Sequence, residues 1–206
     1  MQYKPAFLCH GKLLRIFHGI IYKMHTYTKE FPMNIRKAKP DDLNSVLSLY
    51  AHARQQMAVS GNPTQWGSDK PALETVLQDI RQGCLFLIES GGEIVGVFAF
   101  LLGEEPTYRT IEGKWQNDLP YGVIHRIAGN GRQKGILEQC LNFCDTFTHN
   151  LRIDTHRQNA IMRHLLQKNG FLECGIIYVE DKTPRIAFQR CTDDPKTRRE
   201  HRKNFP

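Results

Sequence analysis

The chain has 206 residues, of which 40% are hydrophobic, and this is enough apolar material for one domain with its own core. Its formal net charge is +7, but the ends carry most of it: residues 1–32 hold +4 and residues 191–206 hold +2. A nearly neutral body argues against nucleic-acid binding. The six cysteines form no C-x-x-C pair and most lie in apolar patterns, so we expect buried thiols in a cytoplasmic protein rather than disulfides or a metal site.

Residues 1–32 show no coherent apolar pattern. Arg15, His18 and Gly19 interrupt the apolar residues between positions 13 and 22. No run approaches the ~20 apolar residues that cross a bilayer. A secretory signal is disfavoured as well, because no uninterrupted apolar region precedes a small-residue cleavage site. The sequence therefore favours neither a membrane span nor a signal peptide here.

Regular patterns begin at Met33, where alternating residues predict a first strand. We therefore expect one domain over residues 33–190. The extension 1–32 is either an appendage of that domain or the product of an upstream start codon. The charged tail 191–206 is expected to be disordered.

A pair of helices is expected next. Pro40 and the two acidic residues after it are typical of a helix start, and an apolar face continues to Ala51. Residues 61–63, Gly-Asn-Pro, end this helix, and a second one is expected over residues 71–82. Short strands are expected at residues 84–88 and 94–102, which flank a hairpin turn, and at 108–111, 151–155, 175–180 and 185–189.

The stretch 121–144 carries the strongest functional pattern. Its β-branched residues predict a strand near 123–127, and apolar residues with helical spacing predict a helix over 136–144. The loop between them is rich in glycine, which lets consecutive backbone N–H groups point into one concavity. The following helix adds its own unpaired N–H groups and the positive end of its dipole. Such a loop predicts a phosphate site, to which Arg132 and Lys134 add charge.

Spacing separates this loop from two common phosphate-binding patterns. The Walker pattern requires Gly-Lys-Ser/Thr, whereas two aliphatic residues follow Gly135. The dinucleotide pattern requires G-x-G-x-x-G, whereas the glycines here give G-x-G-x-x-x-G. The segment Arg132-Gln133-Lys134-Gly135-Ile136-Leu137 instead resembles the R/Q-x-x-G-x-G/A signature of the GNAT acetyltransferase superfamily, with Leu137 in place of the last small residue.

A second stretch carries the same resemblance. Residues 151–155 predict a strand, and residues 159–171 predict a helix that ends near Gly170. In the family an asparagine opens this helix and Gly-Phe closes it, at the spacing of Asn159, Gly170 and Phe171. Two motifs in the family's order extend the resemblance over most of the predicted domain.

The resemblance implies an α/β fold, in which a mixed, mainly antiparallel sheet splays at the central strand and carries helices on both faces. It implies an acetyl-coenzyme A-dependent N-acetyltransferase that acts on an amine of a small molecule or peptide. Acetyl-coenzyme A is then the co-substrate, and no metal, nucleic acid or membrane is expected to take part. We expect a monomer or a homodimer.

The same resemblance assigns the coenzyme contacts. Backbone groups near Ile127 and Ala128 are expected to pair with the pantetheine arm, and Asn159 is expected to reach the coenzyme from the later helix. The pyrophosphate is then held by the loop and the start of its helix, which are Arg132, Gln133, Lys134, Gly135, Ile136 and Leu137. Gly135→Glu adds bulk and a negative charge at this site, so it is expected to weaken coenzyme binding. The fold is expected to survive, because glutamate is a better helix former than glycine.

Acetyl transfer also needs a base for the amine proton and an acid for the departing thiolate. Many relatives place a tyrosine seven residues after the helix-opening asparagine, but Leu166 occupies that position. Histidine titrates near neutral pH, so His125 is either the base or a structural histidine of the sheet. Tyr178 is either the acid or a packed tyrosine. Since side chains alternate along a strand, at most one of His125 and Arg126 is expected to face the cleft.

Three residues are candidates for contact with the acceptor. Trp66 lies in the connection between the two helices, which family members place beside the acceptor opening, and it is either a lid residue or a packing anchor. Trp115 lies in the polar segment that leads into the central strand. Arg126 either binds a carboxylate of the acceptor or pairs with Asp118 or Asp154, and the ion pair is favoured.

Two other functions remain as alternatives. The departures at Leu137 and Leu166 leave open a non-catalytic module that binds or senses acyl-coenzyme A. A nucleotide-dependent oxidoreductase is disfavoured by the glycine spacing. The sequence does not identify the amine acceptor.

Overall fold

The structure is a computed structural model, and it describes residues 32–192. The predicted extension and the predicted tail lie almost wholly outside these residues. Within them, none of the helices combines the length and the hydropathy that a bilayer crossing needs.

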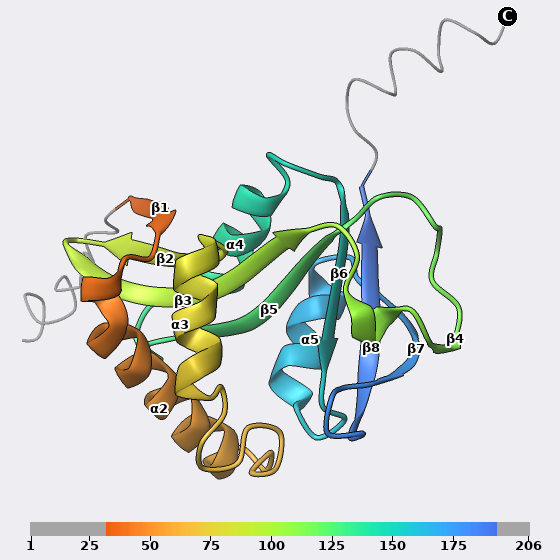
Figure 1. Ribbon diagram of the computed structural model, residues 1–206, viewed down its shortest axis with the longest axis horizontal. Helices are drawn as coiled ribbons and strands as arrows, with labels where there is room; N and C mark the ends of the chain where they lie inside the picture. Colours follow the sequence, from red (N-terminus) through yellow and green to blue (C-terminus); the bar gives the residue numbers. More distant parts are fainter. Residues whose placement is uncertain (1–31, 193–206) are drawn as a thin grey trace, which may run out of the picture. The chain divides into compact units, whose positions relative to one another are not determined.

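One sheet organises the described residues (Figure 1). Its strands are β1 (Met33–Lys37), β2 (Leu85–Ser90), β3 (Glu93–Leu102), β4 (Glu112–Gly113), β5 (Gly122–Gly129), β6 (Asn150–Thr155), β7 (Leu172–Tyr178) and β8 (Pro184–Cys191). Their spatial order is β1-β2-β3-β5-β6-β8-β7-β4. β5 and β6 run parallel, and the other neighbours run antiparallel. The predicted fold, a mixed and mainly antiparallel sheet, is confirmed.

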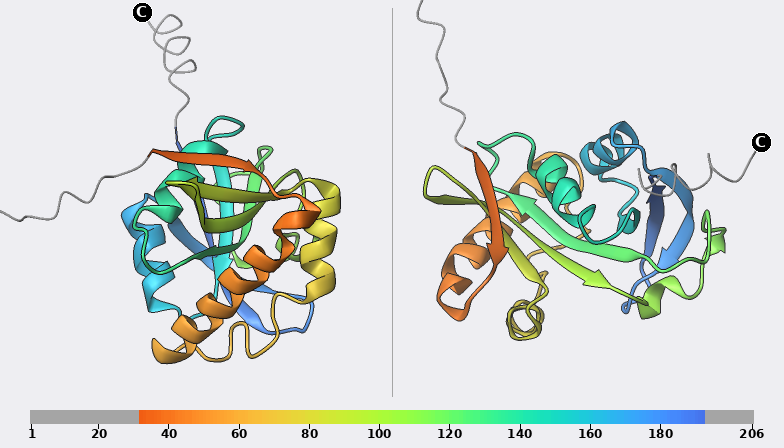
Figure 2. Two further views of the ribbon diagram at one scale, coloured as in Figure 1. Left: turned by 90° about the vertical axis from the view of Figure 1, so that its left-hand side faces the viewer. Right: turned by 90° about the horizontal axis from the view of Figure 1, so that it is seen from above.

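Helices cover both faces of the sheet (Figure 2). They are α2 (Leu43–Val59), α3 (Leu73–Gln82), α4 (Ile136–Cys144) and α5 (Ala160–Lys168). On one face, Tyr50 of α2 and Val76 of α3 pack into a core with Val97 of β3. On the other face, Leu141 of α4 and Leu166 of α5 pack into a core with phenylalanines of β2 and β3. The sheet is therefore the middle layer between two apolar cores.

Two glycines allow α4 to begin very close to the sheet. A Cβ atom at Gly96 of β3 would lie 3.0 Å from Cγ2 of Ile136, and one at Gly129 of β5 would lie 3.1 Å from Cγ1 of the same side chain. Ile136 is the first residue of α4. The absence of side chains at Gly96 and Gly129 therefore lets Ile136 pack on the strands. This contact holds the start of α4 close in space to the C-terminal end of β5.

β5 and β6 are neighbours over a very short distance. They pair at Gly122 with Leu151 and at Val123 with Arg152, and no further pairs follow. Beyond Val123 the two strands diverge (Figure 1). The predicted splay at the central strand is thereby confirmed, and the diverging strands leave one edge of β5 without a neighbouring strand.

A bulge changes the direction of side chains in the middle of β5. Between the pairs Ala99–His125 and Val97–Ala128, β5 contains one residue more than β3. Arg126 lies in this bulge with a φ of +52°, in the left-handed region. An extra residue interrupts the alternation of side chains between the two faces, so neighbouring residues need not point to opposite sides here.

The expected strand at residues 108–111 is wrong. The chain instead forms a 3₁₀ turn at Pro106–Tyr108, and a two-residue strand follows at Glu112–Gly113. Glu105 stabilises this turn, because its carboxylate accepts a hydrogen bond from Thr107 N–H at 3.2 Å. Such a cap at the start of a turn competes with extended structure.

Candidate functional site

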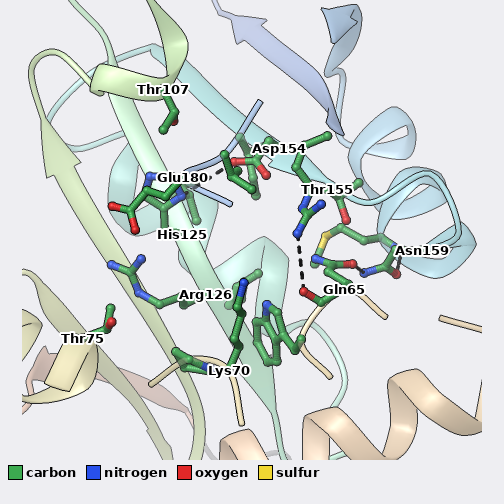
Figure 3. Close-up of a pocket in the computed structure, with 18 of the residues that line it drawn as sticks. Gln65, Lys70, Thr75, Thr107, His125, Arg126, Asp154, Thr155, Asn159 and Glu180 are labelled. Atoms are coloured by element: carbon green, nitrogen blue, oxygen red, sulfur yellow. Dashed lines mark hydrogen bonds and ion pairs between the residues drawn. The ribbon is translucent and has the colours of Figure 1, made fainter. Parts of the chain in front are cut away.

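A cavity of about 450 Å³ lies where β5 and β6 diverge, with walls from both strands (Figure 3). The helix connection between α2 and α3 and the turn between β7 and β8 complete it. The chain segments that contribute to its walls include residues 65–66, 70–72, 124–127, 153–155 and 179–181. The cavity therefore depends on segments that are far apart in the sequence.

His125 lies between two carboxylates on the wall of this cavity. Its Nε2 atom is 3.1 Å from Oε2 of Glu105, and its Nδ1 atom is 3.8 Å from Oδ1 of Asp154. Asp154 also accepts a hydrogen bond of 2.8 Å from the buried hydroxyl of Tyr108. The hydrogen bond with His125 is the main cause that lowers the pKa of Glu105 to about 2, and Thr107 adds to this effect. Glu105 is therefore a carboxylate at neutral pH.

Arg126 forms an ion pair with α3. Its Nε and Nη2 atoms donate to the two carboxylate oxygens of Asp79 in α3, at 2.8 and 3.0 Å. The expected pairing with Asp118 or Asp154 is therefore wrong. Both Arg126 and His125 line the cavity (Figure 3), so the expectation that at most one of them faces it is also wrong. The bulge at Arg126 is the physical reason, because it breaks the alternation of side chains.

Trp66 is a packing anchor that also lines the cavity, and its contact with an acceptor stays a prediction. Its ring packs edge-on against the buried ring of Tyr50, with centroids 5.6 Å apart. The same residue lines the cavity. Trp66 is thus anchored by α2, and its free surface is available to a ligand.

Trp115 and Tyr178 do not line the cavity. Trp115 is buried in a separate apolar cluster, where its Nε1 atom donates to the carbonyl of Tyr108 at 3.1 Å. Tyr178 is 42% exposed and its hydroxyl donates to Glu112 at 2.9 Å, a contact that raises the pKa of the tyrosine. We therefore withdraw Trp115 as an acceptor contact and Tyr178 as the acid.

The glycine-rich loop is held by Asn130 and leads into the N-terminus of α4. The side-chain oxygen of Asn130 accepts the N–H groups of Arg132 and Gln133, both at 3.0 Å. Gly135 precedes α4 with a φ of +79°. The helix bond from Gln139 N–H to the Gly135 carbonyl leaves the N–H groups before it, at residues 136–138, without intrahelical acceptors.

The loop residues 132–137 do not line the cavity, although β5 connects the two directly. Arg132 reaches back to the hairpin, where it is 3.3 Å from the carboxylate of Glu93, and both side chains are exposed. Leu137, the second residue of α4, is buried in the core against the sheet. The left-handed φ at Gly135 also corrects one expectation, because any other residue is strained there and Gly135→Glu will not leave the fold unaffected.

Asn159 and Leu166, in the second motif, both stabilise the fold around α5. Asn159 caps α5, because its side-chain oxygen accepts Met162 N–H at 3.1 Å, and its amide donates to the side chain of Gln65 at 2.9 Å. Asn159 also lines the cavity. Leu166 is fully buried in the core. Among the residues that line the cavity within 32–192, none is a tyrosine.

The cysteines of residues 32–192 are free thiols. In the described part of the chain, no group of three or more His, Cys, Asp or Glu side chains could hold a metal ion. Cys140 and Cys144 are free, and both are residues of α4 that are buried in the core. This agrees with their expected packing role.

Sequence reasoning missed the carboxylates around His125 and the ion pair at the rim of the cavity. Glu105 is 20 residues from His125 along the chain, and nothing in its own surroundings indicates the contact. Lys70 pairs with Asp181 across 111 residues, which connects the α2–α3 connection to the β7–β8 turn. A signal existed for Asp79, since a charged residue at the apolar spacing of Val76 and Ile80 calls for a buried partner.

Comparison with solved structures finds the same architecture in acetyltransferases. An acetyltransferase of the GNAT family from Streptococcus agalactiae is 29% identical, with a TM-score of 0.72 over 80% of this chain and 98% of its own. A putative acetyltransferase from Staphylococcus aureus is 24% identical, with a TM-score of 0.57 over 76% and 97%. A ribosomal-protein-alanine N-acetyltransferase from Brucella melitensis is 20% identical, with a TM-score of 0.51 over 77% and 99%. No family model matches the chain, and no curated protein sequence does.

Proposed function

Because this chain belongs to the GNAT superfamily of acetyltransferases, we propose that it transfers an acetyl group from acetyl-coenzyme A to an amine of a small molecule or peptide. The observation that carries the proposal is the placement of His125. This side chain lies between Glu105 and Asp154 on the wall of a cavity that opens at the splay of β5 and β6.

Two features of the chain fit acetyl-coenzyme A as the co-substrate. Beyond Val123, β5 has an edge without a neighbouring strand, and the backbone near Ile127 and Ala128 on this edge would pair with the amides of the pantetheine arm. The N–H groups at the start of α4, which have no intrahelical acceptors, would hold the diphosphate together with Arg132 and Lys134. Asn159 lines the cavity at the opposite wall.

His125 is the proposed general base. An amine must lose a proton before it can attack a thioester, and an imidazole within reach of the acceptor takes it. Glu105 orients the ring. Glu105 and Asp154 together stabilise the positive charge that the ring acquires when it takes the proton. The carboxylates of Asp154 and Glu180 also favour a cationic amine near the ring (Figure 3). Acetyl transfer then forms an N–C bond and breaks the S–C bond. The thiolate takes a proton from water, and the hydroxide left behind takes back the proton that His125 accepted from the amine.

A non-catalytic acyl-coenzyme A module remains the second candidate. It is favoured by one observation, which is that the position of the expected tyrosine holds Leu166 in the core and no tyrosine lines the cavity among the described residues. Such a module would bind the coenzyme without accelerating acetyl transfer.

Thiol release from acetyl-coenzyme A, measured with a panel of amines, separates the two candidates. We expect at least one amine to accelerate release above the rate of hydrolysis. His125→Ala is then expected to lower turnover roughly 10²–10⁴-fold with the coenzyme Kd unchanged. His164→Ala serves as the matched control, because His164 is exposed on α5 and does not line the cavity. Coenzyme binding without turnover of any amine would favour the binding module, and full activity of His125→Ala would return His125 to a structural role.

A further inference from the structure

A buried guanidinium at the cavity has no carboxylate partner. Arg185 of β8 is 7% exposed and lines the cavity. Its Nη1 atom donates to the hydroxyl of Thr183 at 2.9 Å and to the carbonyl of Pro184 at 3.0 Å, and its Nη2 atom is 3.5 Å from the carbonyl of Gln65. All these acceptors are neutral, and no carboxylate of residues 32–192 lies within ion-pair distance of it. Buried arginines are usually paired with an anion.

The nearest acidic group in this hydrogen-bond chain is already neutralised. The hydroxyl of Thr183 that accepts from Arg185 donates to Asp181. Asp181 in turn forms an ion pair with Lys70. The carboxylate of Asp181 is therefore the counter-charge of the Lys70 ammonium group, and the guanidinium of Arg185 has no counter-charge of its own.

A second polar group at the same wall lacks a partner. The hydroxyl of Thr155, at the end of β6, is buried and has no hydrogen-bond partner in the described residues, and Thr155 is 1% exposed. Thr155 pairs with Ile186, the residue after Arg185 in β8, so both residues lie at the same end of the β6–β8 strand pair. Both residues line the cavity. An unpaired buried hydroxyl is costly, and a ligand oxygen would satisfy it.

The surroundings of this wall are cationic. The pKa of His156 is lowered by burial and by the positive charges of Arg185 and Arg157. Asn159 then opens α5, whose positive dipole end lies at this side of the cavity. The opposite side holds His125 and Glu180 (Figure 3). The surroundings of Arg185 therefore favour an anion, whereas Asp154 and Glu180 favour an amine near His125.

We propose that Arg185 and Thr155 form a carboxylate-binding subsite for the acceptor, so that the acceptor is a small molecule with both an amine and a carboxylate, of the amino-acid type. This inference rests on the proposed function, because the amine must face His125. The coenzyme's phosphates are not the anion that it needs, since the loop residues 132–137 lie outside the cavity. The guanidinium binds the carboxylate as a charge-assisted pair, and the threonine hydroxyl donates to the same group.

Matched acceptor pairs test the subsite, because the two members of each pair differ by one carboxylate. The pairs are leucine with isopentylamine, phenylalanine with phenethylamine, lysine with cadaverine, and β-alanine with ethylamine. Binding of each compound to the complex with coenzyme A is measured by isothermal titration, and turnover is measured by thiol release. For at least one pair, we expect the carboxylate member to bind and react roughly 10–100-fold better than its partner.

Two variants and a control identify the residues that are responsible. Arg185→Met is expected to remove the preference within each pair and leave the coenzyme Kd unchanged. Thr155→Val keeps the shape and removes a hydroxyl without a protein partner, so we expect unchanged stability and a loss of roughly 3–10-fold in affinity for the carboxylate member. Arg157→Met removes the same charge from an exposed neighbour that does not line the cavity, and it is expected to keep the preference. Thr155→Val still tests the subsite if Arg185→Met fails to fold.

The outcomes separate this inference from the proposed function. Turnover of amines without any preference for the carboxylate member overturns the subsite and leaves the acetyltransferase intact. Carboxylate binding that depends on Arg185, without turnover, supports the subsite and refutes the acetyltransferase. A preference that survives Arg185→Met, weaker coenzyme binding in that variant, or no binding by any member of the panel overturns the subsite.

Discussion

Gly135→Glu tests the backbone of the loop and its charge at once. Gly135 has a φ of +79° directly before α4, and the left-handed region costs other residues about 1–2 kcal/mol. Steric room is sufficient, because the nearest atom to an added Cβ is Cε of Met33 at 3.8 Å. We therefore expect the free energy of unfolding to fall by about 1–2 kcal/mol, which lowers the Tm by about 2–8 °C for a chain of this size.

The same substitution places a negative charge at the predicted diphosphate site. Two charges ~4 Å apart interact by about 4 kcal/mol at a near-surface dielectric, which sets an upper limit. Gly135 is exposed, so solvent screening reduces this value. We expect coenzyme A to bind roughly 10–100-fold more weakly, which corresponds to about 1.4–2.8 kcal/mol.

Gly61→Glu is the matched control, because Gly61 has a similar φ of +84° and nothing within 4 Å of an added Cβ. It is expected to lose the same stability and to keep the coenzyme affinity. Isothermal titration with coenzyme A and a circular dichroism melt measure both quantities for each variant. Wild-type affinity in a folded Gly135→Glu variant would show that the loop does not hold the diphosphate. An unchanged Tm would refute the backbone argument.

Three further predictions concern stability. Asp79→Ala leaves the guanidinium of Arg126 without its partner, so we expect urea unfolding to show a loss of about 2–4 kcal/mol; a loss below about 0.5 kcal/mol would contradict this. The pKa of Glu105 is lowered from 4.5 to about 2, mainly by its hydrogen bond with His125. The contribution of this carboxylate to the free energy of unfolding is therefore present above pH 4.5 and is lost as the pH falls toward 2. The stabilities of the wild type and of Glu105→Gln, measured by urea unfolding, should converge over this pH range. A chain that begins at Met33 is expected to fold and bind coenzyme A, whereas an insoluble product or a Tm many degrees lower would show that residues 1–32 pack as part of the domain.

Local patterns were sufficient for most of the fold. Glycine, proline and apolar spacing indicated the helices and nearly all strands, because these signals act over a few residues. The two motifs then led, through the resemblance, to a mixed, mainly antiparallel sheet that splays at its central strand. The exception, near Tyr108, had the β-forming composition of a strand, but Glu105 caps a 3₁₀ turn there and Tyr108 bonds to Asp154.

The site was harder to predict because its contacts are not local. His125 was found since it adjoins a motif, but its partners Glu105 and Asp154 come from a turn and another strand. The bulge at Arg126 contains no glycine that would indicate it. Arg185 lies in an ordinary strand pattern, and its lack of a counter-charge is visible only when the surrounding segments are in place.

The scattered origin of the cavity walls has a thermodynamic consequence. Residues between positions 57 and 185 form the cavity together, so an unfolded chain cannot offer this site to a small molecule. A compound that binds there associates with the native state alone, and mass action then raises the free energy of unfolding by about 2.7 kcal/mol at 100 times its Kd. The heat resistance of the protein thus becomes a readout of its ligands, and it identifies an occupant whether or not any chemistry follows.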